Sequence, residues 1–285
     1  MTRLKVWTVI PAVAVALVAG GCVESTTSSA PGTDGVSLVQ SGKLLTCAHL
    51  PYVPFQYKDG NDVVGFDVDV VDFAAKKLNV PQQIVDTPFD GIKSGADLNS
   101  KQCDVVAGAI TINDTRAQNF DFTIPYFQAT QALLTKTGND YKTLESLAGK
   151  KVGVQSDTTG EAYIKGWNAK NGGVITAVAF EDSALLETAV KTGQVDASIN
   201  DNGILYDYAK KNPDTQVSAE FNTNEQYGFG VKKGNAALLK VLNDAIKASA
   251  TDGSYAKAYQ KWFGKRPSWQ PGDATSSAPT TTSKG

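Results

Sequence analysis

The sequence predicts an α/β fold built from two lobes. Apolar stretches of strand length alternate with stretches of helical periodicity, and repeated strand–helix units of this kind form parallel sheets. The units fall into two series, and each series has its own apolar strands. The 230 residues from Ser37 to Arg266 are enough to bury two modest hydrophobic cores.

The first series begins with an apolar strand at residues 44–48, and an extended segment at 63–66 follows the polar turn at 59–62. Helical spacing then places five apolar side chains on one face of a helix, those of Phe66, Val70, Phe73, Ala74 and Leu78. Residues 104–110 are almost all apolar or small, which predicts a buried parallel strand.

The second series repeats the alternation. Its predicted elements are a strand at 151–155, a helix from Glu161, a strand at 174–180, a helix at 183–191 and a strand at 195–199. The chain then returns to two helices, whose apolar positions are Leu239, Leu242 and Ile246, followed by Tyr255, Tyr259 and Trp262 before Gly264.

The first 21 residues have the pattern of a secretory signal peptide. Arg3 and Lys5 precede an apolar run at residues 6–18 that is too short to span a bilayer comfortably, and small residues follow it. The position of Cys22 resembles that of the lipidated cysteine of a bacterial lipobox, with Ala19 where leucine is usual. We expect a lipoprotein anchored to the outer face of the cell membrane through Cys22. An ordinary signal peptide with an incidental cysteine is the alternative.

Small polar residues follow Cys22 and recur at the C-terminal end. They predict a flexible linker over residues 22–38 and a disordered tail over 267–285. The formal net charge is −2, whereas nucleic-acid binding needs clustered Lys and Arg, so no nucleic-acid partner is expected.

Two further cysteines would lie in an oxidising compartment. If Cys22 carries lipid, Cys47 and Cys103 remain as an even pair, and we predict that they form a disulfide. The alternative is two buried thiols, because a strand register could hold their Cα atoms beyond the limit of about 7 Å.

The chain offers few groups for covalent or metal chemistry. A Ser-His-Asp or Cys-His site would need His49, the sole histidine, and no nucleophile motif lies near it. Zinc is disfavoured by this histidine count, and no P-loop or dinucleotide fingerprint is present. We expect a binding protein that is not an enzyme and that holds no metal and no cofactor.

Polar residues gather at three junctions between a strand and a helix. These junctions are residues 109–116, 155–161 and 199–203, and Thr158 with Glu161 forms a Thr-x-x-Glu capping box in the second. Ligands of open α/β sheets lie beyond the carboxyl ends of the strands, where these junctions would be. Taken singly, Asn113, Thr158 and Asp201 could each be a plain helix cap. Their combination favours a binding site.

Five stretches, in order, resemble the bacterial extracellular solute-binding proteins of family 3, the polar amino-acid class that feeds ABC importers. The stretches are residues 51–57 (PYVPFQY), 65–70 (GFDVDV), 109–116 (AITINDTR) with 121–127 (DFTIPYF), 152–155 (VGVQ) with Thr158 and Thr159, and 252–255 (DGSY) with 261–264 (KWFG). The resemblance runs from about Gly42 to Phe263.

The resemblance implies a type II periplasmic-binding-protein-like fold, in which each lobe is a mainly parallel sheet flanked by helices. Lobe 1 would comprise residues 39–127 and 228–266, and lobe 2 residues 131–223, with two hinge crossings between them. It also implies a monomer that closes on one polar amino acid and delivers it to an ABC transporter permease.

The resemblance further implies the residues that bind the amino acid. Arg116 would pair with the α-carboxylate, together with Thr159 at a helix start, because a guanidinium offers a planar bidentate fork. The α-ammonium would be held by Asp201, Thr111 and the carbonyl of Ala109. The remaining expected binding residues are Tyr52, Phe89, His49, Gln155 and Thr158, with Tyr52 and Phe89 flanking the ligand side chain.

His49 stands where many relatives carry a carboxylate, which weakens the case for a cationic ligand. A neutral His49 and Gln155 would fit glutamine, asparagine or glutamate, and core packing is the alternative role for His49. Two other classes remain. Dehydratases of cyclic carboxylic acids share the fold and could use His49 or Asp201 as acid or base, and a ligand sensor module is the third reading.

Overall fold

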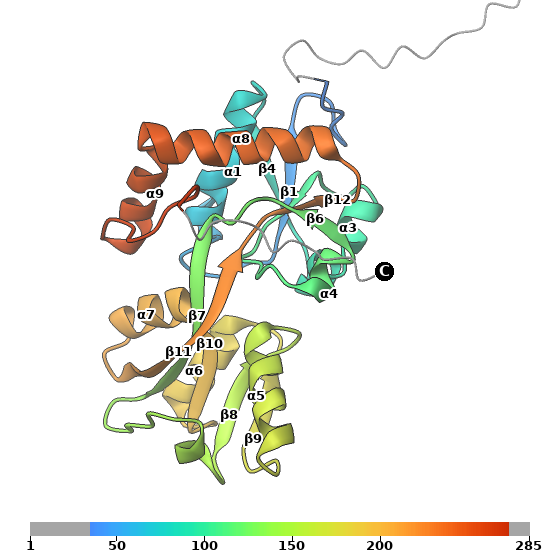
Figure 1. Ribbon diagram of the computed structural model, residues 1–285. Coiled ribbons are helices and arrows are strands. Elements are labelled where there is room, and N and C mark those ends of the chain that lie inside the picture. The colour runs from blue at the N-terminus through green and yellow to red at the C-terminus, as the bar shows by residue number, and fades with distance from the viewer. Residues whose placement is uncertain (1–34, 274–285) are drawn as a thin grey trace, which may run out of the picture.

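The structure is a computed structural model that describes residues 35–273. The predicted signal peptide, Cys22 and most of the predicted linker lie outside the described residues, as does the tail from residue 274. Two lobes are stacked one above the other and joined by a pair of long strands (Figure 1). Each lobe is a five-stranded sheet with helices, which confirms the predicted α/β class.

Lobe 1 is defined here by the sheet with strand order β4-β1-β5-β12-β6 and the elements packed with it. Its strands are β1 (Leu44–Ala48), β4 (Gln82–Asp86), β5 (Val105–Val106), β6 (Phe120–Phe122) and β12 (Gly230–Lys232), with a hairpin of β2 (Tyr57–Asp59) and β3 (Asp62–Val64). Its helices are α1 (Phe66–Lys77), α2 (Phe89–Lys93), α3 (Ala96–Asn99), α4 (Asp114–Ala117), α8 (Ala236–Asp252) and α9 (Ser254–Phe263).

Lobe 2 is defined by the sheet with strand order β11-β7-β10-β8-β9. Its strands are β7 (Phe127–Lys136), β8 (Lys151–Gln155), β9 (Thr176–Phe180), β10 (Ala197–Asp201) and β11 (Thr215–Tyr227). Its helices are the short η1 (Glu145–Leu147), then α5 (Thr159–Lys170), α6 (Ser183–Thr192) and α7 (Asn202–Lys211).

The expectation of mainly parallel sheets is confirmed, although each sheet contains one strand that runs antiparallel to the other four. In lobe 1, β12 runs antiparallel to both of its neighbours, β5 and β6. In lobe 2, β7 runs antiparallel to both β10 and β11. The remaining pairs, β1 with β4 and β5, and β8 with β9 and β10, are parallel. The two odd strands follow directly on the crossings between lobes, so no crossover helix forces them to be parallel.

Three predicted boundaries also differ from the structure. Val36 is buried in the core of lobe 1, so ordered packing begins inside the predicted 22–38 linker. At the other end, Asp273 exchanges main-chain and side-chain hydrogen bonds with Gln270, inside the predicted 267–285 tail. The strand predicted at 104–110 shortens to β5, because Gly108 and Ala109 have positive φ angles of 150° and 50°.

Aromatic side chains pack where the chain crosses between the lobes. The ring of Phe127 at the start of β7 stacks on that of Tyr227 at the end of β11, with centroids 5.3 Å apart. Phe55 lies edge-on to both rings. A Cβ atom at Gly203, at the start of α7, would lie 3.1 Å from the Phe55 ring. The aromatic packing at the crossing therefore forms part of the hydrophobic core of lobe 1.

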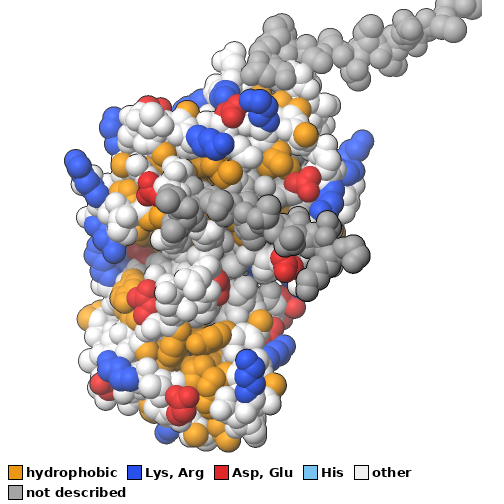
Figure 2. All heavy atoms as spheres, in the orientation of Figure 1, with side chains coloured by type: hydrophobic (Ala, Val, Ile, Leu, Met, Phe, Trp, Pro, Cys, Tyr) orange, Lys and Arg blue, Asp and Glu red, His pale blue; other side chains and the backbone are white. Residues whose placement is uncertain are grey.

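Among residues 35–273, the helices are all too short or too polar to cross a membrane. The face drawn in Figure 2 shows Lys and Arg interspersed with Asp and Glu over both lobes, with no large field of one sign.

Cys47 in β1 and Cys103 just before β5 form a disulfide with a Cα–Cα distance of 5.7 Å. It closes a loop with a sequence separation of 56 residues. Both cysteines lie in the apolar cluster under α2 and α3, beside Ile92 and Leu98. The bond therefore ties β1 to the segment that leads through β5 to the strand–helix junction at residues 109–116.

We expect the Cys47→Ala/Cys103→Ala double variant to unfold at a lower denaturant concentration than wild type. Its free energy of unfolding should be smaller by about 2–4 kcal/mol, because the unfolded chain is no longer constrained by the disulfide. Urea unfolding followed by circular dichroism measures this difference, with reduced and oxidised wild type as the reference pair. Two reactive thiols in denatured, unreduced protein, in addition to any thiol at Cys22, would contradict the bond itself.

Candidate functional site

The ten predicted binding residues line one cavity between the lobes. Its lining residues are His49, Tyr52, Gln56, Phe89, Gly108, Ala109, Thr111, Arg116, Gln155, Thr158, Thr159 and Asp201. Lobe 1 contributes those up to Arg116, and lobe 2 contributes the other four from the ends of β8 and β10 and the start of α5. Gln56 and Gly108 were not predicted.

Arg116 is the buried cation of the cavity. It lies in α4, whose first turn is capped by the Asn113 side chain accepting from the Arg116 main-chain N–H at 2.9 Å. The side chain is 7% exposed, its Nη1 donates to the Thr111 carbonyl at 2.9 Å, and the guanidinium lies 5.6 Å from the Phe89 ring centroid. Among residues 35–273, the guanidinium has no other hydrogen-bond acceptor. Burial lowers its pKa, opposed by the charges of Asp201 and Glu225. The remaining N–H donors can receive an anion.

Asp201 is the buried acid on the other lobe. It occupies the N-cap position of α7, yet its side chain does not cap the helix. Its carboxylate instead accepts from Gln131 Nε2 at 2.5 Å and from the Tyr227 hydroxyl. Burial, followed by the charge of Glu225, raises the pKa of Asp201 to about 7. The alternative that these polar residues are plain helix caps holds for Asn113 and Thr158, whose side chains cap α4 and α5, but not for Asp201.

Glu225, which sequence reasoning missed, joins the two lobes at the edge of the cavity. Its carboxylate accepts from the hydroxyls of Thr111 at 3.1 Å and Thr159 at 2.9 Å, and from Gln131 Nε2 at 3.2 Å. Gln131 was missed as well. Glu225 and Gln131 both lie on the strands that cross between the lobes. The predicted position of these crossings was the only feature of the sequence that could have pointed to them.

The loop of Gly108 and Ala109 is held by a buried carboxylate from α1. Asp67 Oδ2 accepts from the main-chain N–H groups of Gly108 at 3.0 Å and Ala109 at 2.7 Å, and Oδ1 accepts from the Tyr126 hydroxyl at 2.6 Å. Burial raises the pKa of Asp67 to about 7 despite these three donors. Asp67 thus fixes a left-handed turn that positions the Ala109 and Thr111 main chain at the cavity wall.

His49 has a protein contact at both ring nitrogens, in addition to its place in the cavity lining. Nδ1 lies 3.1 Å from the Thr87 carbonyl, and Nε2 lies 2.8 Å from Asp182 Oδ1 on lobe 2. Both neighbours are oxygen atoms of the protein, and one of them belongs to the other lobe. His49 therefore lines the cavity as part of a contact between the lobes.

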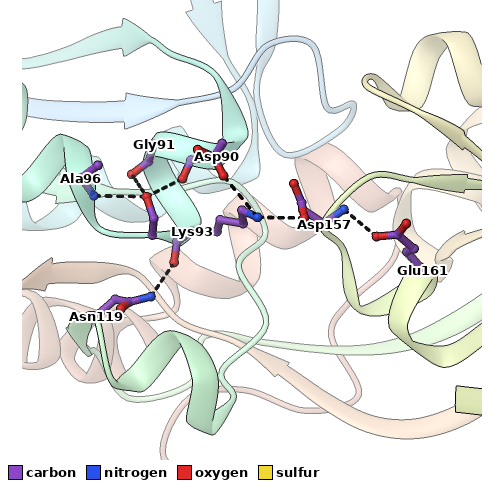
Figure 3. Close-up of polar contacts among 8 residues, drawn as sticks. Asp90, Gly91, Lys93, Ala96, Asn119, Asp157 and Glu161 are labelled. Atoms are coloured by element: carbon purple, nitrogen blue, oxygen red, sulfur yellow. Dashed lines mark hydrogen bonds and ion pairs between the residues drawn. The ribbon is translucent and has the colours of Figure 1, made fainter. Parts of the chain in front are cut away.

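Two more contacts span the lobes beside the cavity. The Tyr52 hydroxyl donates to Asn200 Oδ1 at 3.0 Å. Lys93 Nζ on α2 lies 2.9 Å from Asp157 Oδ1 and 3.2 Å from Asp90 Oδ1 (Figure 3). Asp157 is itself fixed at a φ of 64°, with its main-chain N–H donating to Glu161 Oε2 at 2.9 Å. The predicted capping box is thus modified, because Thr158 caps the helix but Glu161 accepts from Asp157.

In the part of the chain from residue 35 to residue 273, no cluster of three or more His, Cys, Asp or Glu residues could hold a metal ion. The polar groups of the cavity are instead a guanidinium, a carboxylate, hydroxyls and amides. Such a set can bind a small zwitterion with its anionic group at Arg116 and its cationic group at Asp201.

The chain is similar to known binding proteins over most of its length. It is 34% identical to the L-cystine-binding protein of Escherichia coli (strain K12), covering 88% of this chain and 92% of that protein. It is 33% identical to the ABC transporter glutamine-binding protein of Bacillus subtilis (strain 168), covering 72% and 75%. Solved structures of an ancestral arginine-binding protein, bound to arginine and to glutamine, are 39% identical. Both superpose with a TM-score of 0.73, covering 78% and 79% of this chain and 99% and 100% of theirs.

These relatives are binding proteins and not enzymes, which confirms the non-enzymatic reading and the type II fold. The model of the bacterial extracellular solute-binding proteins, family 3, matches residues 44–265. This chain belongs to that family and is an amino-acid solute-binding protein of ABC transport.

Proposed function

We propose that this protein is an extracytoplasmic, lipid-anchored receptor that binds one polar amino acid between its lobes and delivers it, as a monomer, to an ABC permease. The observation that carries the proposal is the buried pair of opposite charges on facing lobes. Arg116 on lobe 1 has guanidinium donors to spare, and Asp201 on lobe 2 has a carboxylate at the same cavity.

The α-carboxylate of the amino acid would bind Arg116, with help from the main-chain N–H of Thr159 at the start of α5. The α-ammonium would bind Asp201, the hydroxyl of Thr111 and the carbonyl of Ala109. The cavity is then complete only when both lobes contribute, which is the basis of a closing hinge.

The ligand side chain would lie between Tyr52 and Phe89, with Gln155, Thr158 and His49 around its far end. The proteins similar to this chain are named for cystine, glutamine and arginine. All three ligands share the α-amino and α-carboxylate groups, which supports an α-amino acid here.

Arg116→Ala should weaken amino-acid binding by at least about 2–5 kcal/mol, because it leaves a buried ligand carboxylate and Asp201 without their cation. Isothermal titration calorimetry against the twenty amino acids measures the loss. Arg266→Ala, which removes an exposed arginine, is the control and should bind as wild type does. A change of less than tenfold for Arg116→Ala would show that the carboxylate binds elsewhere.

Amino-acid affinity should fall as the pH drops below about 7. The raised pKa of Asp201 means that its carboxyl is protonated below that pH, and an α-ammonium must displace the proton in order to bind. Calorimetry at pH 6 in two buffers of different ionisation enthalpy should detect close to one proton released. In Glu225→Gln, which lacks the neighbouring charge, the fall should begin at lower pH. An affinity that is constant from pH 5 to pH 8 would contradict this role of Asp201.

The anchor is tested separately at Cys22. Wild-type protein expressed in its own cells should take up labelled palmitate and fractionate with membranes, whereas Cys22→Ala should do neither. Ser25→Ala is the matched control and should behave as wild type does. Membrane retention of Cys22→Ala would contradict a lipid anchor at Cys22, whereas wild-type protein that is unlabelled and released would favour an ordinary signal peptide.

A further inference from the structure

We infer that the far end of the cavity selects a ligand side chain that ends in N–H donors and rejects one that ends in a carboxylate. The inference rests on the proposed function. It depends on two buried glutamines, Gln155 and Gln56, that line the cavity from different lobes. The side-chain groups that carry such N–H donors are a carboxamide, an ammonium and a guanidinium.

Gln155, the last residue of β8, presents a hydrogen-bond acceptor. Its side chain is 3% exposed, and its Nε2 donates to the Glu181 main-chain carbonyl at 3.2 Å. Because a carbonyl must receive the N–H side of the amide, this contact fixes which way the amide faces. Oε1 is left without a hydrogen-bond partner among residues 35–273.

Gln56 repeats this arrangement from lobe 1. It is 1% exposed, and its Nε2 donates to the His49 main-chain carbonyl at 3.3 Å. Its Oε1 is buried and has no hydrogen-bond partner within the described part of the chain. Two amide oxygens of the cavity wall are therefore oriented by main-chain carbonyls and left unpaired, and buried acceptors of this kind are costly unless a donor reaches them.

The other polar groups around the side-chain end are already engaged. Both ring nitrogens of His49 face acceptors of the protein. The Thr158 hydroxyl donates to the Gln155 carbonyl at 2.8 Å and accepts from the Glu161 main-chain N–H at 3.2 Å. Neither His49 nor Thr158 supplies a spare donor for a ligand carboxylate, so the donors left at this end are the second N–H of each glutamine amide. Arg116 is assigned to the α-carboxylate.

A side-chain carboxylate would therefore lose its water and meet amide oxygens, whereas an N–H donor would satisfy them. Burying a charge without a partner costs several times more than a neutral hydrogen bond returns. Among the three side chains that the sequence left open, glutamine and asparagine fit this wall and glutamate does not.

The test is calorimetric titration of the wild-type protein at pH 7.5 with the near-isosteric pairs glutamine and glutamate, and asparagine and aspartate, and with arginine and lysine. We expect at least one donor-bearing amino acid to bind at least about tenfold more tightly than glutamate and aspartate. Tighter binding of glutamine or asparagine assigns the donor to a carboxamide, and tighter binding of arginine or lysine assigns it to a cation. Glutamate or aspartate as the tightest ligand would overturn the inference and leave the proposed function intact. Heat from none of the twenty amino acids would overturn the proposed function itself.

The variants Gln155→Met and Gln56→Met remove one acceptor each while keeping a side chain of similar length. Each should reduce the affinity ratio of the preferred ligand to its acidic counterpart by at least about threefold. Gln216→Met is the matched control, because the Gln216 amide also donates to a main-chain carbonyl, that of Asn139 at 3.1 Å, at an exposed position outside the cavity lining. An unchanged ratio in both variants, with thermal unfolding as in wild type, would overturn the inference.

Discussion

The antiparallel pairing of β7 with β11 is the constraint on which the site depends. These strands carry the chain out of lobe 1 and back, and they pair from Phe127 opposite Tyr227 onward. The register shifts between Phe221 and Glu225, so residues 222–224 have no partner on β7. The shift places Glu225 near Gln131, and Gln131 lies opposite Asp201 on the neighbouring β10. The register of β10 with β7 and the irregularity of β11 together bring three polar side chains to the junction of the lobes.

This junction brings charged side chains together at buried positions, those of Asp201 and Arg116. Asp201 and Glu225 both accept from the Gln131 amide nitrogen, and the charge of Glu225 contributes to the raised pKa of Asp201. Asp201 is buried and Glu225 is half-buried, and two such neighbouring carboxylates are unfavourable unless a cation or several donors accompany them. Arg116 supplies part of that compensation from lobe 1. The α-ammonium of an amino acid would supply the rest, so ligand binding and lobe closure relieve the same electrostatic cost.

Much of the site was predictable because its residues follow strands. Residues 109–116, 155–161 and 199–203 each begin at the end of a strand, and the carboxyl ends of neighbouring strands meet at one edge of a sheet. Seven of the ten predicted residues lie in these junctions, and the resemblance to family 3 implied the other three, His49, Tyr52 and Phe89, together with the binding roles. All ten line one cavity. Glu225, Gln131 and Gln56 were not predicted, because their roles depend on a strand register, a bulge and an amide orientation. His49 was placed at the cavity, but its partner Asp182 lies 133 residues away on the other lobe.

The sequence alone determined the α/β class, the two series of elements and the residue types at the three junctions, because these follow from local hydrophobic periodicity and strand ends. The tertiary structure decided which strands run antiparallel, since direction depends on how the chain re-enters each sheet. It also decided that Asp201 faces the cavity and does not cap its helix. Finally, it decided which atoms of Gln56 and Gln155 remain free. A hydrogen bond to a main-chain carbonyl 7 residues away for Gln56 and 26 residues away for Gln155 makes that choice, and it forms only once the chain has folded.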